Sequence, residues 1–113
     1  MANLFVNKKV DLTSTSAVAM YTVPTATTGV IKSILVSEDS GNADTITITI
    51  TDTAGAVFSV FKTKAIGANA TVELLTEPLV LQESEILTVT AATANRLHVI
   101  LSSLQIKPRE VTT

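Results

Sequence analysis

The sequence contains no cysteine and no tryptophan, and charged residues make up only 16% of its 113 residues. Without cysteine, disulfide bonds and thiolate metal sites are excluded. The net charge of -2 argues against a nucleic-acid partner, because nucleic-acid-binding modules need basic residues to neutralise phosphates. No apolar run approaches the ~20 residues that cross a bilayer, so we expect no membrane partner.

Hydrophobic and polar residues alternate along most of the chain, and the clearest case is residues 44–51. The isoleucines of this segment share one parity, and the other parity carries Thr45, Thr47 and Thr49. Successive side chains of a strand point to opposite faces, so this spacing separates an apolar face from a threonine face. Isoleucine and threonine are both β-branched, which further favours a strand.

Similar short segments recur between turn signals. They cover residues 5–12, 17–23, 30–38, 57–63, 70–75, 79–81, 86–91 and 97–106. Asp52 and Gly55 supply a turn that should join residues 44–51 and 57–63 into a hairpin. A chain of this length makes one domain, which we place at residues 1–113. The prediction is therefore all-β: a single β-sandwich or jelly roll of about eight short antiparallel strands.

The segment at residues 97–106 changes parity partway along. Its apolar residues up to position 101 share one parity, whereas Leu104 and Ile106 fall on the other. A β-bulge inserts one extra residue into a strand and would bring both groups to the same face. We therefore expect a bulge near Ser102 and Ser103, with all of these apolar residues facing the core.

Residues 1–10, residues 107–113, or both are predicted to be terminal arms that contact neighbouring subunits. The second has no apolar periodicity, and its proline cannot donate a hydrogen bond to a sheet. Ordering such a segment costs ~1–2 kcal/mol per residue, which contact with a neighbouring subunit would offset. The candidate subunit-contact residues are the basic and proline positions of these ends and the threonine face, namely Lys8, Lys9, Lys107, Pro108, Arg109, Thr45, Thr47 and Thr49.

Residue types that carry catalysis or hold metals are sparse. The single histidine, His98, lies within a strand-like segment, which favours a structural role over that of a catalytic base. The acidic cluster at residues 38–44 lacks the ligand spacing of an EF-hand, so a polar turn is favoured over a calcium site. We therefore expect no enzymatic activity, no cofactor, no bound metal and no small-molecule substrate.

The order of several motifs resembles that of the small β-sandwich structural proteins in the particles of tailed bacteriophages. Members typically carry a Y-x-x-P motif, a T-[AG]-V-[IV]-x-x-[IL] strand, a G-x-x-x-x-[LV] turn and an L-x-x-G-D-x-[IL]-x-V strand. The corresponding segments here begin at Tyr21, Thr28, Gly67 and Leu81, and together with the closing strand they span residues 21–106. The sequence departs from the family pattern at Ser84-Glu85, where Gly-Asp is common.

The resemblance implies a capsid decoration (cement) protein that stabilises the phage head by binding the major capsid protein lattice. It further implies a homo-oligomer, with a trimer as the first expectation, on the outer capsid surface of a virion assembled in the bacterial host cytoplasm. The alternative within the same class is a tail, neck or head-fibre component. The alternative from another class is a carbohydrate-binding adhesion module, although the sequence has only one tyrosine and three phenylalanines to stack on sugars.

Overall fold

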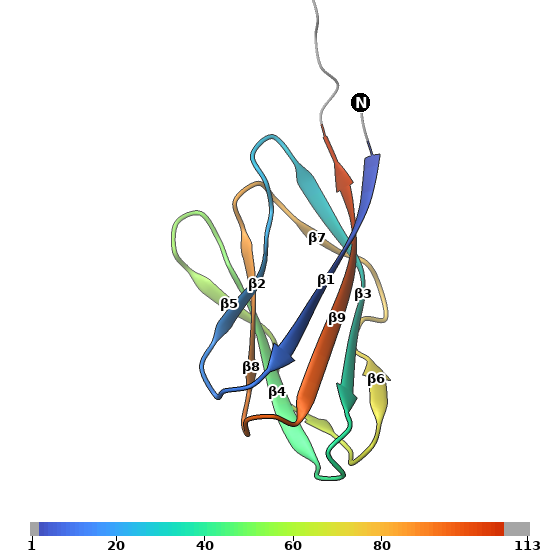
Figure 1. The fold of residues 1–113 in the computed structure, drawn as a ribbon. Coiled ribbons are helices and arrows are strands. Elements are labelled where there is room, and N and C mark those ends of the chain that lie inside the picture. The colour runs from blue at the N-terminus through green and yellow to red at the C-terminus, as the bar shows by residue number, and fades with distance from the viewer. Residues whose placement is uncertain (1–2, 108–113) are drawn as a thin grey trace, which may run out of the picture.

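The computed structural model describes residues 3–107. Within this range the regular secondary structure consists of β-strands, without a helix (Figure 1). The strands are β1 (Asn3–Leu12), β2 (Val18–Thr22), β3 (Thr28–Glu38), β4 (Asp44–Thr51), β5 (Val57–Ile66), β6 (Thr71–Glu73), β7 (Leu79–Leu81), β8 (Ile86–Ala91) and β9 (Leu97–Ile106). Their pairings are antiparallel, so the predicted all-β class is confirmed.

Two sheets pack face to face as a small β-sandwich. Sheet A has the order β1-β9-β3-β6, with β7 also paired to β3, and sheet B has the order β2-β8-β4-β5 (Figure 1). Strands β4 and β5 form the predicted hairpin. In its turn Gly55 adopts a φ of 89° and donates from its backbone N–H to the carbonyl of Asp52 at 3.0 Å.

The core consists of the inward-pointing side chains of both sheets. In β4, Ile46 and Ile48 are fully buried, while the threonines that alternate with them are partly exposed. The sheets contribute further fully buried residues, which are Leu12, Ile31, Ile34, Val36, Leu97, Val99 and Leu101 from sheet A and Ile66, Leu87, Val89 and Ala91 from sheet B. Burying each large aliphatic side chain contributes ~1.5–3 kcal/mol, so this closed layer is the main source of stability.

Strand β9 does not contain the predicted bulge. It alternates regularly from end to end, so Leu104 and Ile106 point outward from sheet A, and Ser103 and Gln105 point inward. The register shift lies instead in the neighbouring strand β3, where Lys32 is the extra residue opposite Ser102 and Ser103. The prediction was wrong because it assumed that apolar residues must face the core.

The inward polar residues of β9 are satisfied by a tyrosine. The hydroxyl of Tyr21 on β2 accepts hydrogen bonds from Gln105 Nε2 at 3.0 Å and from Ser103 Oγ at 3.3 Å. Gly29 leaves room for this hydroxyl, because a Cβ at that position would lie 3.0 Å from it. The hydrogen bonds remove most of the cost of placing polar groups inside the sandwich, so β9 needs no bulge.

Residues 3–10 are part of the fold, which corrects the prediction of an arm for that part of residues 1–10. Strand β1 pairs with β9 without interruption from Asn3 to Leu12. Ten residues in regular register satisfy one edge of the backbone, and Leu12 reaches the core. Of the predicted C-terminal arm at residues 107–113, only Lys107 lies within the described residues, and it follows directly on the end of β9.

Replacing Ile48 with aspartate tests the assignment of faces in β4. Ile48 is 0% exposed, and an unpaired carboxylate there costs several kcal/mol, which is comparable with the ~5–15 kcal/mol that holds a domain together. We expect Ile48→Asp to abolish cooperative thermal unfolding measured by circular dichroism. Thr47→Asp, on the opposite face of the same strand, should keep a cooperative transition. A folded Ile48→Asp variant would refute the assignment.

Replacing Tyr21 with phenylalanine tests the buried polar cluster. The change keeps the ring but leaves the side chains of Ser103 and Gln105 buried without their partner, so we expect urea unfolding to show a loss of ~1–3 kcal/mol. Adding Gln105→Leu to this variant should restore part of the loss, because it removes one of the stranded groups. Equal stability of Tyr21→Phe and the parent chain would contradict this account.

Candidate partner-binding surfaces

The outer face of sheet B carries a regular array of threonines. Strands β4 and β8 direct six of them outward, namely Thr45, Thr47, Thr49, Thr51, Thr88 and Thr90. Thr47 lies beside Thr90, and Thr49 lies beside Thr88, across the two central strands. All six are partly exposed, and we call this surface the threonine face. The alternation that buries Ile46 and Ile48 therefore also produces this surface on the opposite side.

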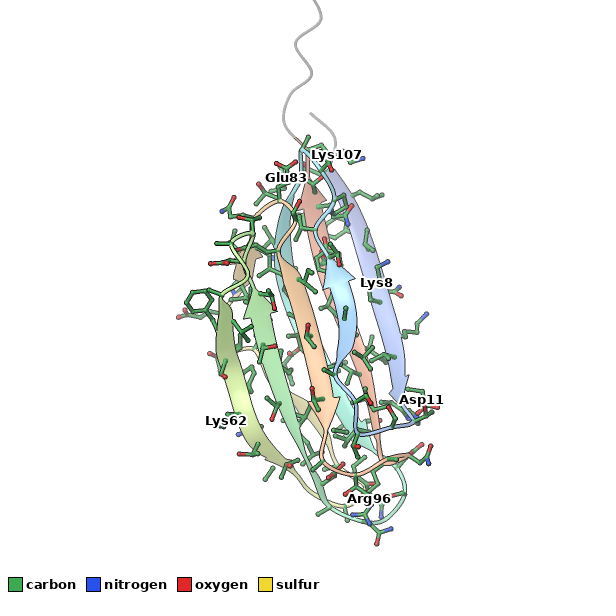
Figure 2. All side chains as sticks on the ribbon, turned by 90° about the vertical axis from the view of Figure 1, so that its left-hand side faces the viewer. Lys8, Asp11, Lys62, Glu83, Arg96 and Lys107 are labelled. Atoms are coloured by element: carbon green, nitrogen blue, oxygen red, sulfur yellow. The ribbon has the colours of Figure 1, made fainter. Side chains whose placement is uncertain are left out.

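Two rows of paired residues across the threonine face carry no charge. One row runs Ala19, Thr88, Thr49, Ser59 across all four strands, and the next runs Thr22, Ile86, Thr51, Val57. Figure 2 looks onto this face, and the charged residues labelled there lie around its outline. Threonine is stiff at χ1 and uncharged, so a partner that covers these two rows incurs little loss of side-chain entropy and no desolvation of ions there.

The outer face of sheet A has a different character. Its upper part holds an apolar row that crosses four strands, made of Phe5, Leu104, Val30 and Val80. Phe5 is 77% exposed and Val80 52% exposed, although both are large apolar side chains. Exposed apolar groups that line up across a sheet form a contiguous patch, which is typical of a surface that meets another protein.

A second row of this face carries charges of opposite sign at its two ends. It runs Lys9, Ile100, Leu35, Glu73 from β1 to β6, and we call it the mixed row. Burial alone would raise the pKa of Glu73, but hydrogen bonds from the Ser33 hydroxyl and from backbone N–H groups lower it below its ordinary value. Glu73 is therefore an anion at neutral pH.

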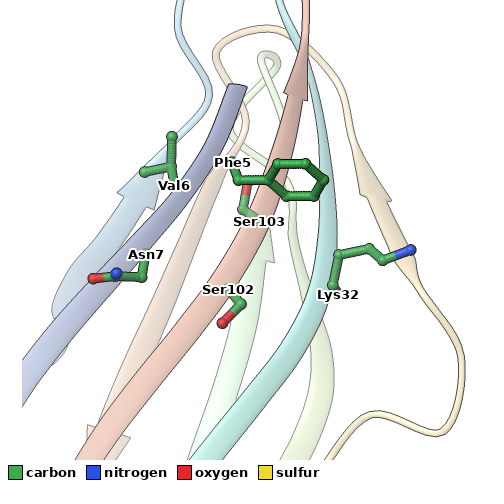
Figure 3. Close-up of a pocket in the computed structure, with 6 residues that line it drawn as sticks. All are labelled: Phe5, Val6, Asn7, Lys32, Ser102 and Ser103. Atoms are coloured by element: carbon green, nitrogen blue, oxygen red, sulfur yellow. The ribbon is translucent and has the colours of Figure 1, made fainter. Parts of the chain in front are cut away.

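A shallow hollow of about 360 Å³ lies between the two rows. It is lined in part by Phe5, Asn7, Lys32 and Ser102, and Figure 3 shows the Phe5 ring extending from β1 over the neighbouring strand. The β-bulge at Lys32 shapes this hollow by displacing one residue of β3 from the regular register. Its open form, with the Phe5 ring beside polar side chains, suits a side chain of a protein partner.

His98 lies on the same outer face, at the end of the sheet remote from the apolar row. Its Nε2 lies 3.2 Å from Asp11 Oδ1, and its Nδ1 lies 3.5 Å from Asp39 Oδ2. The two carboxylates are on opposite sides of the ring, so they hold its orientation. The predicted structural role for His98 fits this geometry, since the histidine joins β1 and the turn after β3 to β9.

Glu38 is the one carboxylate of the acidic cluster that is almost completely buried, with 1% exposure. Its donors are Ser40 through both hydroxyl and N–H, Gly41 N–H at 3.1 Å and Asn69 N–H at 3.0 Å. Burial alone would raise the pKa of Glu38, but these hydrogen bonds to the ionised form lower it from 4.5 to about 2. The carboxylate thus holds together the loop after β3 and the loop before β6. The acidic cluster at residues 38–44, predicted to be a polar turn, therefore contains a structural carboxylate.

The candidate contact residues do not gather in one place. Lys9 lies on the outer face of sheet A, whereas its neighbour Lys8 pairs with the inward residue Leu101 and so has the opposite orientation. Lys107 is exposed beyond the end of β9. Pro108 and Arg109 lie outside the described residues.

The predictions from the sequence did not include two sets of surface residues. The apolar row was missed because Leu104 was assigned to the core, although its parity already placed it on the outer face. The second half of the threonine face was missed although Thr88 and Thr90 alternate with buried residues in the same way as the threonines of β4. In both cases the signal was the unbroken period of two.

Comparisons with known proteins add no information about these surfaces. No family model, no curated protein and no solved structure matches this chain. Across residues 3–107 no helix is long and apolar enough to span a membrane. The same residues include no cluster of three or more His, Cys, Asp or Glu side chains suited to a metal ion.

The lowered pKa of Glu38 predicts a specific pH dependence of stability. Because its folded pKa of about 2 lies below the ordinary value of 4.5, the ionised carboxylate stabilises the fold fully above pH 4.5, and this contribution is lost as the pH falls toward 2. We expect Glu38→Gln to be less stable than the parent at pH 7, and the difference to shrink between pH 4.5 and 2. Urea unfolding across this range measures it.

Glu77→Gln is the matched control, because Glu77 is an exposed loop residue. It should follow the parent curve throughout the acid range. A Glu38→Gln curve that runs parallel to the parent curve would show that Glu38 contributes no pH-dependent stability.

Proposed function

We propose that this chain is a capsid decoration protein of a tailed bacteriophage, which binds the major capsid protein lattice on the outer surface of the head. The observation that carries the proposal is the threonine face, on which two rows of uncharged residues cross all four strands of sheet B. The resemblance of residues 21–106 to phage structural proteins supplies the identity of the partner.

The threonine face suits the binding of a preformed protein surface. Both of its central strands are paired on each side within sheet B, so the backbone beneath the face is fixed before contact. The side chains are short, and each offers a methyl group for packing and a hydroxyl for hydrogen bonding. Binding then needs little ordering of either partner, which favours affinity per unit area.

The size of the threonine face predicts weak binding by one copy and strong retention by many. Four strands at ~4.8 Å spacing, covered over about six residues of ~3.3 Å, present roughly 400 Å². This is about half of what one partner contributes to an interface of standard size. Copies that also contact each other on a repeating lattice gain affinity through multivalency, as a decoration protein requires.

Addition of the purified protein to undecorated, expanded phage heads tests the proposal. We expect co-sedimentation that saturates at a fixed ratio to the major capsid protein, measured by gel densitometry. Thr47→Asp combined with Thr49→Asp should reduce binding at least tenfold, because two carboxylates would have to be desolvated at the contact.

Thr53→Asp is the matched control, since Thr53 is exposed in the β4–β5 turn and lies off the threonine face. It should bind heads as the parent does. Recovery of the protein only with tails or necks would refute the placement on the head. Equal binding of all three proteins would refute the threonine face as the contact.

A further inference from the structure

The two rows on the outer face of sheet A are complementary to themselves. A two-fold rotation about an axis that lies in this face and runs along the strands exchanges the β1 edge with the β6 and β7 edge. It brings Lys9 of one copy opposite Glu73 of another, and it repeats the same ion pair on the other side. In the apolar row the same rotation brings Phe5 opposite Val80 and Leu104 opposite Val30.

We propose that two copies of this chain pair face to face through the outer faces of their sheets A, about this axis. Every apolar residue of the two rows then meets an apolar residue, and every charged end meets the opposite charge. A self-complementary patch of this kind is what an isologous two-fold interface needs. Two stacked sheets pack with their strands within about 30° of each other, which this arrangement permits.

The pattern of β9 supports the pairing independently. In its C-terminal half the inward positions hold Ser103 and Gln105, and the outward positions hold Leu104 and Ile106. A strand that faced only its own core on one side and water on the other would carry the reverse order. The inward polar groups are held by Tyr21, so the outward apolar groups are left for a partner.

The size of the face is sufficient for a specific pair. Four strands at ~4.8 Å spacing, over about eight residues of ~3.3 Å, present roughly 500 Å² on each copy. The two copies together would bury about 1,000 Å², which is the size at which a specific interface begins.

The pair would present its two threonine faces on opposite sides and would bring the start of β1 and the end of β9 of both copies to the same end of the axis. If the proposed function holds, each pair bridges two neighbouring capsid subunits, with its axis along a local two-fold axis of the lattice. This bridging is the only part of the inference that rests on the proposed function. The proposed pair takes the place of the trimer that the resemblance implies.

Sedimentation equilibrium of the purified chain tests the pairing without any phage particle. We expect a species of twice the chain mass of 11.9 kDa. Leu104→Asp should raise the dissociation constant of the pair at least about 100-fold, because each copy would bury one new carboxylate in the interface. Val80→Asp, at a more exposed position, should act in the same direction if Leu104→Asp fails to fold. Thr53→Asp, in the β4–β5 turn and off both outer faces, should remain paired.

Particle binding by the same variants separates the two proposals. A monomeric Leu104→Asp that still saturates heads would leave the decoration function intact and remove the bridging. A paired parent chain that binds no heads would leave the pairing intact and remove the function. A parent chain that is monomeric or trimeric at every concentration would overturn the pairing.

The orientation of the pair is tested by zero-length carbodiimide cross-linking of a mixture of ¹⁴N-labelled and ¹⁵N-labelled chains. Within one copy, Lys9 and Glu73 are separated by three strand spacings, or ~14 Å, which is too far for direct amide formation. We therefore expect a Lys9–Glu73 peptide that joins a light and a heavy chain in mass spectrometry. Cross-linked pairs that lack this peptide, or that carry it only within one chain, would overturn the proposed axis.

Discussion

The period-two alternation of apolar and polar residues is the constraint on which the rest of this molecule depends. Each strand that crosses the sandwich must direct one set of side chains into the space between the sheets, and in β4 this set is Ile46 and Ile48. Because that layer is closed, the outward residues need not be apolar for the sheets to pack, although Thr47 still accepts a hydrogen bond from the Thr63 N–H at 3.0 Å. The threonine face and the apolar row are two outward surfaces formed in this way, and they are the surfaces on which the proposed contacts rest.

The buried polar groups keep the alternation unbroken where the sequence is least regular. Tyr21 accepts hydrogen bonds from the inward residues of β9, and Glu38 accepts them from the loops beside it. In the part of the chain that the structure describes, no buried side-chain nitrogen or oxygen lacks a partner. These contacts let β9 run straight, so Leu104 reaches the outer face instead of the core.

The sequence alone predicted the fold class, the β4–β5 hairpin and the buried face of β4, because a period of two determines each of them locally. It did not predict the course of β9 or the pairing of β1. Whether Leu104 faces inward depends on Tyr21, which lies 83 residues away in the chain and reaches β9 only through the packing of two sheets. The rows of sheet A likewise join residues from strands that are distant in sequence, so only the strand register could reveal them.

Cryo-electron microscopy of expanded heads saturated with the purified chain would show whether the threonine face meets the capsid. We expect added density on the outer surface that fits the sandwich, with Thr47 and Thr49 of β4 against the major capsid protein. Heads without added density would contradict it, as would a bound sandwich whose threonine face is turned toward solvent.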